Sequence, residues 1–325
     1  SDVAELHLII LCITSLLMAW FSWRFVEKPF RNKNQTTRKF IFNFAFTGMI
    51  IFTLIGIYIH QKNGYFDYFI ERNSEITNGD IGHNDYHLYV EENYTACADK
   101  KIFTRAPIWN QWVRCQQSST NDPNVAIFGD SHAEHLFLGF SDKNSDNEYI
   151  YLIAGGDAFS GEDSHQYLIN YIIKNEEIET VIYSIYWHRK YTKYGEEGLK
   201  EKLIQTLNIF RKANKNLILV ADVPDFIFDA QYCYFVAKFN KEKYQCEMST
   251  ADFNLQRNYI PMLKGIALEF EAEFIDPSKL FCDDKKCSML KDNTILYRDN
   301  HHLNIPASFL TGRFIKQRSS LLNDN

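Results

Sequence analysis

Two long apolar stretches stand near the start of the chain. Leu6–Trp23 and Phe40–Ile59 contain no Asp, Glu, Lys or Arg. Each is close to the length of about 20 residues that a helix needs to cross a bilayer. We therefore predict two transmembrane helices, with a pair of buried core helices as the alternative. The first stretch lacks the basic leader and the small-residue cleavage site of a signal peptide.

After residue 124 the pattern changes to short β-rich runs that alternate with helical stretches. The runs lie at Val125–Phe128, Tyr149–Ala154, Thr180–Trp187, Leu217–Ala221 and Glu273–Ile275, and helical stretches lie at Glu196–Lys212 and Ala251–Phe270. This alternation predicts an α/β fold, a parallel sheet with helices on both faces. Functional groups in such a sheet gather at the carboxyl ends of the strands.

These patterns divide the chain into three parts: two membrane helices in residues 1–60, an extension in residues 61–124 and an α/β domain in residues 125–325. Hydrophobic residues make up 46% of the chain and aromatic residues 15%, which argues against disorder. The extension has no sustained period, but its Tyr and Phe residues favour burial over a loose tether. We expect structural roles for its residues, including His83 and His87.

Charge predicts the orientation of the chain and narrows its partners. Glu27 alone opposes the cations between the two apolar stretches, which are Arg24, Lys28, Arg31, Lys33, Arg38 and Lys39. Basic loops stay on the cytoplasmic side, so the chain after His60 is predicted to lie outside the membrane. The chain has a net charge of −6 and no basic stripe in its outer part, which argues against nucleic acid as a partner.

The cysteines are consistent with an outer location. Of the seven, Cys12 lies in the first apolar stretch and the other six lie in the predicted outer part. An even number in an oxidising compartment predicts disulfides. Several connectivities are possible, and proximity in sequence suggests Cys97 with Cys115, Cys233 with Cys246 and Cys282 with Cys287. A metal cluster is the alternative, but the paired CxxC spacing of a zinc site is missing, so we expect no metal.

A candidate nucleophile follows the first predicted strand, in the run Gly129-Asp130-Ser131-His132. A Gly permits a tight turn at the end of a strand, and a Ser that opens the next helix lies near backbone N–H groups that stabilise negative charge. Ser131 is therefore a candidate catalytic nucleophile. The alternative is a capping box, in which Ser131 and Glu134 only cap the helix.

A serine nucleophile needs a general base, and that base needs a carboxylate to orient it. His302 and Asp299 can supply both, three residues apart on a predicted loop before the last helix. His301 remains an alternative base. Asn304 is expected to be the N-cap of the final helix.

These two motifs resemble the SGNH (GDSL-like) hydrolase superfamily, and the resemblance covers about 190 residues. It implies a flavodoxin-like sheet with strand order 2-1-3-4-5. It also implies an oxyanion hole built from the N–H of Ser131 and that of a Gly after the second strand, for which Gly156 of Gly155-Gly156 is the candidate.

The family's third oxyanion donor, an Asn after the third strand, is absent. Trp187 stands at about its place, in the run Ser184-Ile185-Tyr186-Trp187-His188. A Trp here looks like the SGNH domains that are fused to membrane acyltransferases. Trp187 is thus a candidate for substrate binding, with a buried structural role as the alternative.

A second resemblance lies in the membrane part. The run Ser22-Trp23-Arg24-Phe25-Val26-Glu27-Lys28-Pro29-Phe30-Arg31 is similar to the closing signature of the acyltransferase-3 membrane family. In fused members one further helix, a periplasmic linker and an SGNH domain follow, which is the order predicted here. The chain therefore looks like the C-terminal piece of a longer protein in the bacterial inner membrane, with its SGNH domain in the periplasm.

Together these resemblances imply an O-acetyltransferase of a bacterial surface polysaccharide such as lipopolysaccharide O-antigen. They imply a Ser131-His302-Asp299 triad, a glycan acceptor, the lipid bilayer and an upstream acyltransferase-3 domain as partners. Acetyl-CoA would be the ultimate donor through that upstream domain, and no cofactor is expected in this part. A carbohydrate acetyl esterase and a degenerate glycan-binding domain are the alternatives.

Overall fold

The computed structural model describes residues 2–28, 37–62, 83–97, 113–141, 147–230, 232–233, 246–292 and 294–322. The chain separates into two compact units, Ser1–Arg72 and Asn73–Asn325. The middle of the extension and residues 29–36 of the basic segment lie outside the described residues.

The first unit contains two long helices, α1 (Asp2–Ser22) and α3 (Arg38–Gln61), with a short π-helix, η1 (Trp23–Glu27), after α1. The N-cap of α3 is Thr37, whose hydroxyl accepts a hydrogen bond from the Phe40 N–H at 3.3 Å. Helix α3 is long and apolar enough to cross a membrane. Among the residues whose side chains are described, Leu11–Phe25 forms a shorter apolar helical segment. Spanning by both helices stays a prediction.

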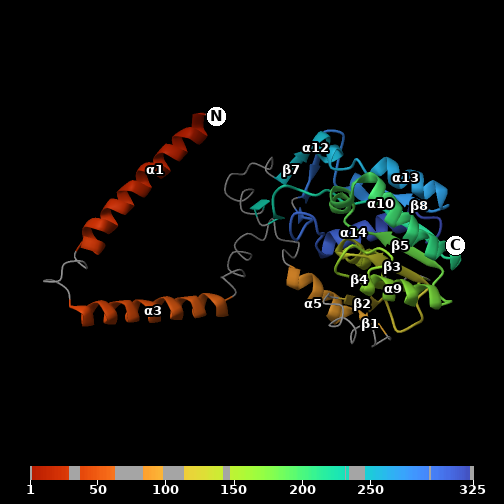
Figure 1. The fold of residues 1–325 in the computed structure, drawn as a ribbon, viewed down its shortest axis with the longest axis horizontal. Coiled ribbons are helices and arrows are strands. Elements are labelled where there is room, and N and C mark those ends of the chain that lie inside the picture. The colour runs from red at the N-terminus through yellow and green to blue at the C-terminus, as the bar shows by residue number, and fades with distance from the viewer. Residues whose placement is uncertain are drawn as a thin grey trace. The chain divides into compact units, whose positions relative to one another are not determined.

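The second unit is an α/β domain (Figure 1). Its principal strands are β1 (Thr95–Ala96), β2 (Val113–Gln117), β3 (Val125–Gly129), β4 (Tyr149–Ala154), β5 (Thr180–Ser184), β6 (Asn216–Val220) and β8 (Glu273–Ile275). Its helices are α5 (His83–Asn93), α7 (Ser131–Glu134), α8 (Phe137–Phe140), α9 (Asp163–Lys174), α10 (Trp187–Lys212), α12 (Thr250–Leu255), α13 (Ile260–Glu269), η4 (Pro277–Leu280) and α14 (Ile305–Lys316).

The central sheet has the order β1-β2-β4-β3-β5-β6-β8. The five strands from β4 to β8 pair in parallel, which confirms the predicted α/β fold and its 2-1-3-4-5 strand order. β2 joins β4 antiparallel, and β1 joins β2 antiparallel. Parallel strands place all their carboxyl ends at one edge, so the segments that follow β3, β4, β5 and β6 meet there.

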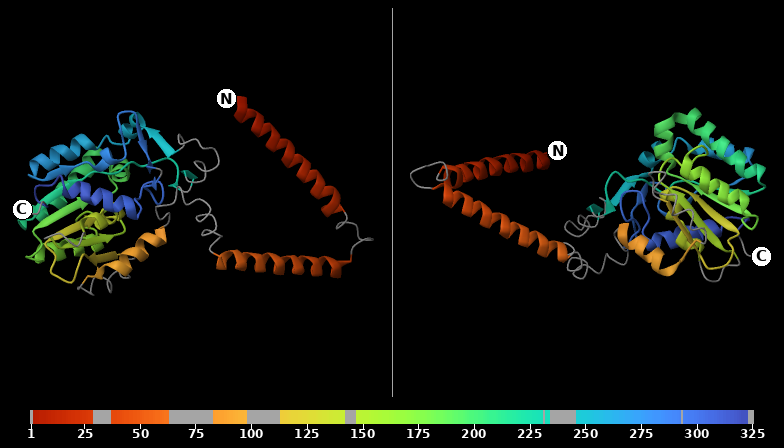
Figure 2. Two further views of the ribbon diagram at one scale, coloured as in Figure 1. Left: turned by 180° about the vertical axis from the view of Figure 1, so that it is seen from behind. Right: turned by 60° about the horizontal axis from the view of Figure 1, so that its bottom comes forward.

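Alternate residues of each strand face two different cores. In β3, Ala126 and Phe128 pack in a cluster with residues of α9, α10 and α13, whereas Val125 and Ile127 pack with residues of α5, α7, α8 and α14. Figures 1 and 2 show these two helical layers on opposite faces of the sheet. Burial on both faces explains why the parallel strands are apolar throughout rather than alternating.

Two predicted elements end earlier than expected or are broken. The run Thr180–Trp187 is a strand only as far as Ser184, because Trp187 already opens α10. The predicted helix Ala251–Phe270 is divided into α12 and α13. Pro261 lies in the first turn of α13, where a missing N–H is tolerated, but it cannot continue a helix that arrives from α12.

The described part of the extension from residue 83 onward belongs to the α/β domain. Strands β1 and β2 extend the sheet, and Tyr86 and Val90 of α5 are buried against it. A disulfide joins Cys97 and Cys115 across this edge, with Cα atoms 5.6 Å apart. Extra strands, helix and disulfide give these residues the structural role that their aromatic content predicts.

The other two disulfides staple a small insertion between β6 and α14. They join Cys233 with Cys246 and Cys282 with Cys287, so all three suggested pairings are confirmed. The insertion holds two small antiparallel pairs that the sequence patterns did not predict, β7 (Glu247–Ser249) with β9 (Lys286–Ser288) and β10 (Leu290–Lys291) with β11 (Thr294–Ile295).

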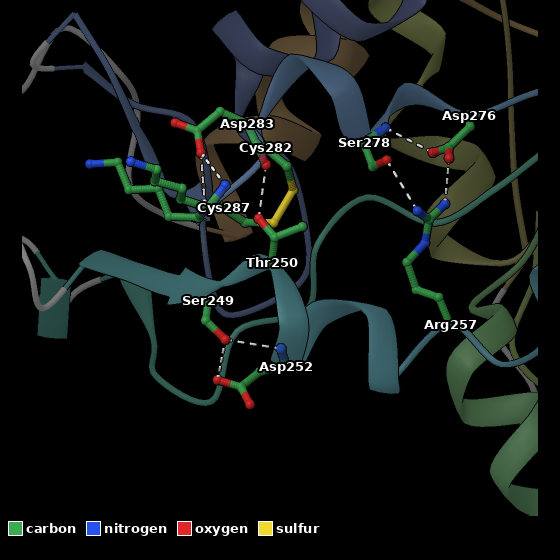
Figure 3. The surroundings of a disulfide bond; sticks show 11 residues. Ser249, Thr250, Asp252, Arg257, Asp276, Ser278, Cys282, Asp283 and Cys287 are labelled. Carbon is green, nitrogen blue, oxygen red and sulfur yellow. Dashed lines mark hydrogen bonds and ion pairs between the residues drawn. A yellow bond between two sulfur atoms is a disulfide. The ribbon is translucent and has the colours of Figure 1, made fainter.

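Polar contacts attach this insertion to the main sheet (Figure 3). The Thr250 hydroxyl donates to the Asp283 carbonyl at 2.8 Å, next to the Cys282–Cys287 bond. Arg257 pairs with Asp276, directly after β8, at 2.7 Å and donates to the Ser278 hydroxyl at 3.3 Å.

Candidate active site

Ser131 begins helix α7 directly after the carboxyl end of β3. The N-cap of this helix is Asp130, whose carboxylate accepts a hydrogen bond from the His132 N–H at 3.0 Å. Glu134, the other member of the proposed capping box, is buried and pairs with Arg114 instead. The capping-box alternative is therefore wrong, and the Ser131 side chain is left to other contacts.

Gly129 lets β3 turn sharply into this helix. Its φ is +153°, and a Cβ at this position would lie 1.7 Å from the Ser184 carbonyl oxygen of the neighbouring strand β5. No other residue can occupy the position without separating the two strands. The glycine thus sets the close spacing of β3 and β5 beneath Ser131.

The structure brings together the three residues that the sequence proposes as a triad. The Nε2 atom of His302 lies 2.8 Å from the Oγ of Ser131, although the two residues are 171 positions apart. On its other side, the Nδ1 of His302 lies 2.7 Å from the Oδ2 of Asp299. Since a carboxylate only accepts, Nδ1 carries the proton, and Nε2 is left to accept the hydrogen bond of the Ser131 hydroxyl. His301 is not the residue that contacts Ser131.

The loop that carries Asp299 and His302 is fixed by its own hydrogen bonds. The Asp299 carboxylate accepts from the backbone N–H groups of His301 and His302 at 2.9 and 2.7 Å. Asn304 caps α14, as predicted, by accepting from the Ala307 N–H at 3.1 Å. These contacts hold the imidazole in place before any substrate arrives.

Burial keeps His302 neutral. Desolvation, aided by the nearby His132 and His301, outweighs the attraction of Asp299 and lowers the pKa of His302 to about 3. Burial by itself raises the pKa of Asp299, but its hydrogen bonds from His302 and from the loop prevail and hold this pKa well below its usual value. At neutral pH the pair is therefore an imidazole beside a carboxylate, the state required of a general base.

A polar cavity of about 650 Å³ opens beside Ser131 and His302. Gly156 lines it, as do Tyr186, Arg189 and Lys190. Gly156, with a φ of +107°, accepts a hydrogen bond on its carbonyl oxygen from the Lys190 ammonium at 2.8 Å. Gly156 thus lies at the same cavity as Ser131, and its role as an oxyanion donor stays a prediction.

Trp187 does not serve as a substrate contact. Its side chain is fully buried among the apolar residues of one core, and its indole N–H donates to the Val220 carbonyl oxygen at 2.7 Å. Tyr186, two residues after the end of β5, lines the cavity instead. The sequence-based candidate was wrong because a Trp beyond a strand end can turn inward as easily as outward, and only its packing decides.

Sequence reasoning missed a second buried Asp–His pair beside the triad. His132 Nδ1 lies 3.0 Å from Asp222 Oδ1, and the His132 side chain is 1% exposed. The Tyr186 ring stacks on both His132 and His301, with ring centroids 4.3 and 4.8 Å away, and the two imidazoles also stack on each other at 5.4 Å. His132, Tyr186 and Asp222 each follow the carboxyl end of a parallel strand, β3, β5 and β6, and this position is the signal that could have identified them.

Glu134, three residues after the nucleophile, forms ion pairs with three segments that are far apart in the sequence. Its carboxylate lies 3.2 Å from Arg114 of β2, 3.3 Å from His87 of α5 and 3.7 Å from Arg298, next to Asp299. These partners hold the pKa of Glu134 down to about 2, even though burial alone would raise it. The charged glutamate therefore fastens the extension and the triad loop to helix α7.

Comparisons with known proteins agree with this fold. The sequence model of a family described as the SGNH domain fused to AT3 domains matches residues 97–317, more than half of the chain. No curated protein matches it.

Among solved structures, the periplasmic domain of a lipopolysaccharide acetyltransferase from Salmonella ser. Paratyphi A is similar, with a TM-score of 0.53 and 18% identity. That match covers 72% of this chain and 95% of the Salmonella domain. At this identity the similarity shows a shared fold. An acetyl xylan esterase matches with a TM-score of 0.36 and 17% identity, over 60% of this chain and 99% of the esterase.

Proposed function

The chain belongs to the family of SGNH domains that are fused to AT3 domains, and on this premise we propose that it acetylates a hydroxyl of a bacterial surface polysaccharide, with lipopolysaccharide O-antigen as the acceptor class. The observation that carries the proposal is the 2.8 Å contact between Ser131 Oγ and His302 Nε2, with Asp299 behind the imidazole. The fold shared with the Salmonella acetyltransferase domain supports the choice of acyl transfer.

The proposed reaction has two steps. In the first, His302 takes the Ser131 proton while Oγ attacks the carbonyl carbon of the acetyl donor; the bond from that carbon to the leaving group breaks, and the leaving group departs with the proton. Acetyl-Ser131 results. In the second, His302 takes the proton of a sugar hydroxyl, whose oxygen attacks the acetyl carbonyl, and Ser131 departs with the proton. The Ser131 and Gly156 N–H groups are the proposed donors to the oxyanion in both steps.

The membrane helices and disulfides support a location for this chemistry. We propose that α1 and α3 anchor the domain in the inner membrane and that the domain lies in the periplasm, where three disulfides are stable. An acyltransferase-3 membrane domain is the proposed partner that supplies acetyl groups from cytoplasmic acetyl-CoA, consistent with the family description.

The amounts of acetylated glycan and of free acetate distinguish transfer from hydrolysis. The full chain, solubilised in detergent, is given p-nitrophenyl acetate with and without deacetylated O-antigen. We expect the acceptor to gain acetyl groups, measured by mass spectrometry, at the expense of free acetate. If all acetyl groups appear as acetate at saturating glycan, the protein is an esterase. If the Ser131 hydroxyl reacts with neither donor nor a serine-directed phosphonate, the glycan-binding alternative is favoured.

The pH profile should reveal the depressed basicity of His302. A base with a pKa of about 3 remains neutral at pH 5, whereas one at the ordinary value of about 6.5 would be only roughly 3% neutral there. Because kcat/KM follows the neutral fraction of the free enzyme's base, we expect kcat/KM for p-nitrophenyl acetate to change by less than about twofold between pH 7 and pH 5.

The control for this profile is circular dichroism at each pH, which separates titration of the base from acid unfolding. A fall in kcat/KM centred near pH 6.5, with the fold intact, would contradict the assigned environment of His302.

A further inference from the structure

Three imidazoles converge at the end of the cavity. His132 comes from α7, and His301 and His302 come from the loop before α14; one ring nitrogen from each lies within 4.8 Å of the other two. His301 and His302 line the cavity, so this cluster can be reached from solvent through it. Imidazole nitrogens are the ligands that Zn²⁺, Cu²⁺, Co²⁺ and Ni²⁺ prefer, and that Mg²⁺ and Ca²⁺ do not.

Each imidazole is oriented through its Nδ1 atom. The Nδ1 of His132 lies 3.0 Å from an Asp222 oxygen, that of His301 lies 2.8 Å from the Asn300 side-chain oxygen, and that of His302 lies 2.7 Å from an Asp299 oxygen. Histidine ligands of metals are usually held in this way, with the second ring nitrogen donating to an oxygen. The Nε2 atoms are therefore the ones left to bind a ligand.

The Nε2 of His132 is a second observation that points to a ligand. It is buried, and no hydrogen-bond partner for it exists among the residues that the structure describes. A buried polar atom without a partner is destabilising, because it has lost its hydrogen bonds to water without replacement. A cation bound between the three rings would satisfy it.

We propose that His132, His301 and His302 form a binding site for a Zn²⁺-class transition-metal ion that inhibits the enzyme reversibly. Zn–N bonds of about 2.0–2.1 Å in a tetrahedron place ligand nitrogens about 3.3 Å apart, so the rings must close by up to about 1.5 Å. The His301 side chain, 23% exposed, has the freedom to make this movement. Water fills the fourth position.

The metal would inhibit because it binds the same His302 nitrogen that takes the proton of Ser131. The Nε2 of His302 accepts the hydrogen bond of Ser131, and one lone pair cannot both coordinate a metal and accept a proton. The sequence prediction of no metal concerned the cysteines, and the six outer cysteines form disulfides. The three histidines are a separate set of ligands. Inhibition rests on the proposed function, but binding of the metal does not.

Direct binding is the first test. The full chain in detergent, with any histidine tag removed and metal stripped by chelator, is titrated with Co²⁺, and the visible d–d absorption is recorded. We expect one equivalent of Co²⁺ with the intense absorption of a tetrahedral site, which Zn²⁺ then bleaches. The Zn²⁺ affinity is measured by competition with a chromophoric chelator.

Matched variants locate the site. His301→Ala should weaken Zn²⁺ binding by at least about tenfold, and Ser131→Ala should leave it unchanged or strengthen it, because the competing hydroxyl is gone. His188→Ala is the control; its ring is bonded to the Gln256 carbonyl outside the cluster, and the Co²⁺ spectrum should not change. Thermal unfolding shows that each variant is folded, and His132→Asn provides a second ligand variant.

The outcomes separate this inference from the proposed function. Absence of the one-equivalent Co²⁺ spectrum, or a spectrum identical in parent and His301→Ala protein, overturns the metal site whatever the catalytic result. A spectrum that depends on His301 in a protein without acetyl-transfer activity supports the site and counts against the function. In an active protein we expect Zn²⁺ to inhibit and EDTA to restore turnover, and full activity with the site occupied would overturn the inhibitory role.

Discussion

Replacement of Ser131 by alanine should lower acetyl transfer by a factor of about 10⁴ or more. The hydroxyl is the atom that would carry the acetyl group, and it lies 2.8 Å from the His302 nitrogen that would take its proton. The backbone N–H groups remain in the variant, so the residual rate reports their contribution alone. Initial rates with p-nitrophenyl acetate and with a glycan acceptor measure the loss, and a phosphonate probe should no longer label the protein.

Ser119→Ala is a matched control for this variant. Ser119 also loses only a hydroxyl, one that donates to Glu148 at 2.8 Å at the start of the domain's sheet, away from the cavity-lining residues. Both variants should unfold at the parent temperature within a few degrees. Ser131→Ala protein that turns over substrate at the parent rate would remove Ser131 from the mechanism.

Replacement of Gly129 by alanine should abolish folding of the α/β domain. The added Cβ would lie 1.7 Å from the Ser184 carbonyl oxygen, and the φ of +153° is one that alanine rarely adopts. Both atoms belong to rigid backbone in the centre of the sheet, so neither can move aside. We expect a loss of more than about 4 kcal/mol, in the exceptional range for one substitution, seen as loss of the cooperative thermal transition.

Gly265→Ala is the opposite control. Gly265 lies in α13 with nothing within 4 Å of an added Cβ, so alanine should stabilise the helix by about 0.5–1 kcal/mol. Gly129→Ala protein with the parent unfolding temperature would show that β3 and β5 do not approach each other as closely as the structure has them.

The parallel strands were predictable because they are short apolar runs bounded by turns and separated by helices. Burial on both faces gives such strands a signal that needs no knowledge of their neighbours. The strands of the insertion were not predictable. β10 and β11 have two residues each, too few for an alternating pattern to show. β7 and β9 pair across the intervening α12, α13 and β8, a contact that no local pattern encodes.

The candidate site shows the same division. Ser131, His302 and Asp299 were found because their chemistry demands a particular set of residue types near strand ends and loops. Trp187 was placed wrongly because inward and outward orientations after β5 differ by only one position along the helix. The Asp222–His132 pair was missed because Asp222, at the end of β6, and His132, after β3, are 90 residues apart, and only the order of strands in the sheet makes them neighbours.

The long separation between Ser131 and His302 has a consequence for biosynthesis. A ribosome adds about 5–20 residues per second, so the 171 positions between nucleophile and base correspond to roughly 10–30 s of translation. During that interval the serine has emerged without its imidazole and cannot be acylated at the catalysed rate. A chain that stalls or is cut before His302 therefore lacks its general base, whatever else of it has folded.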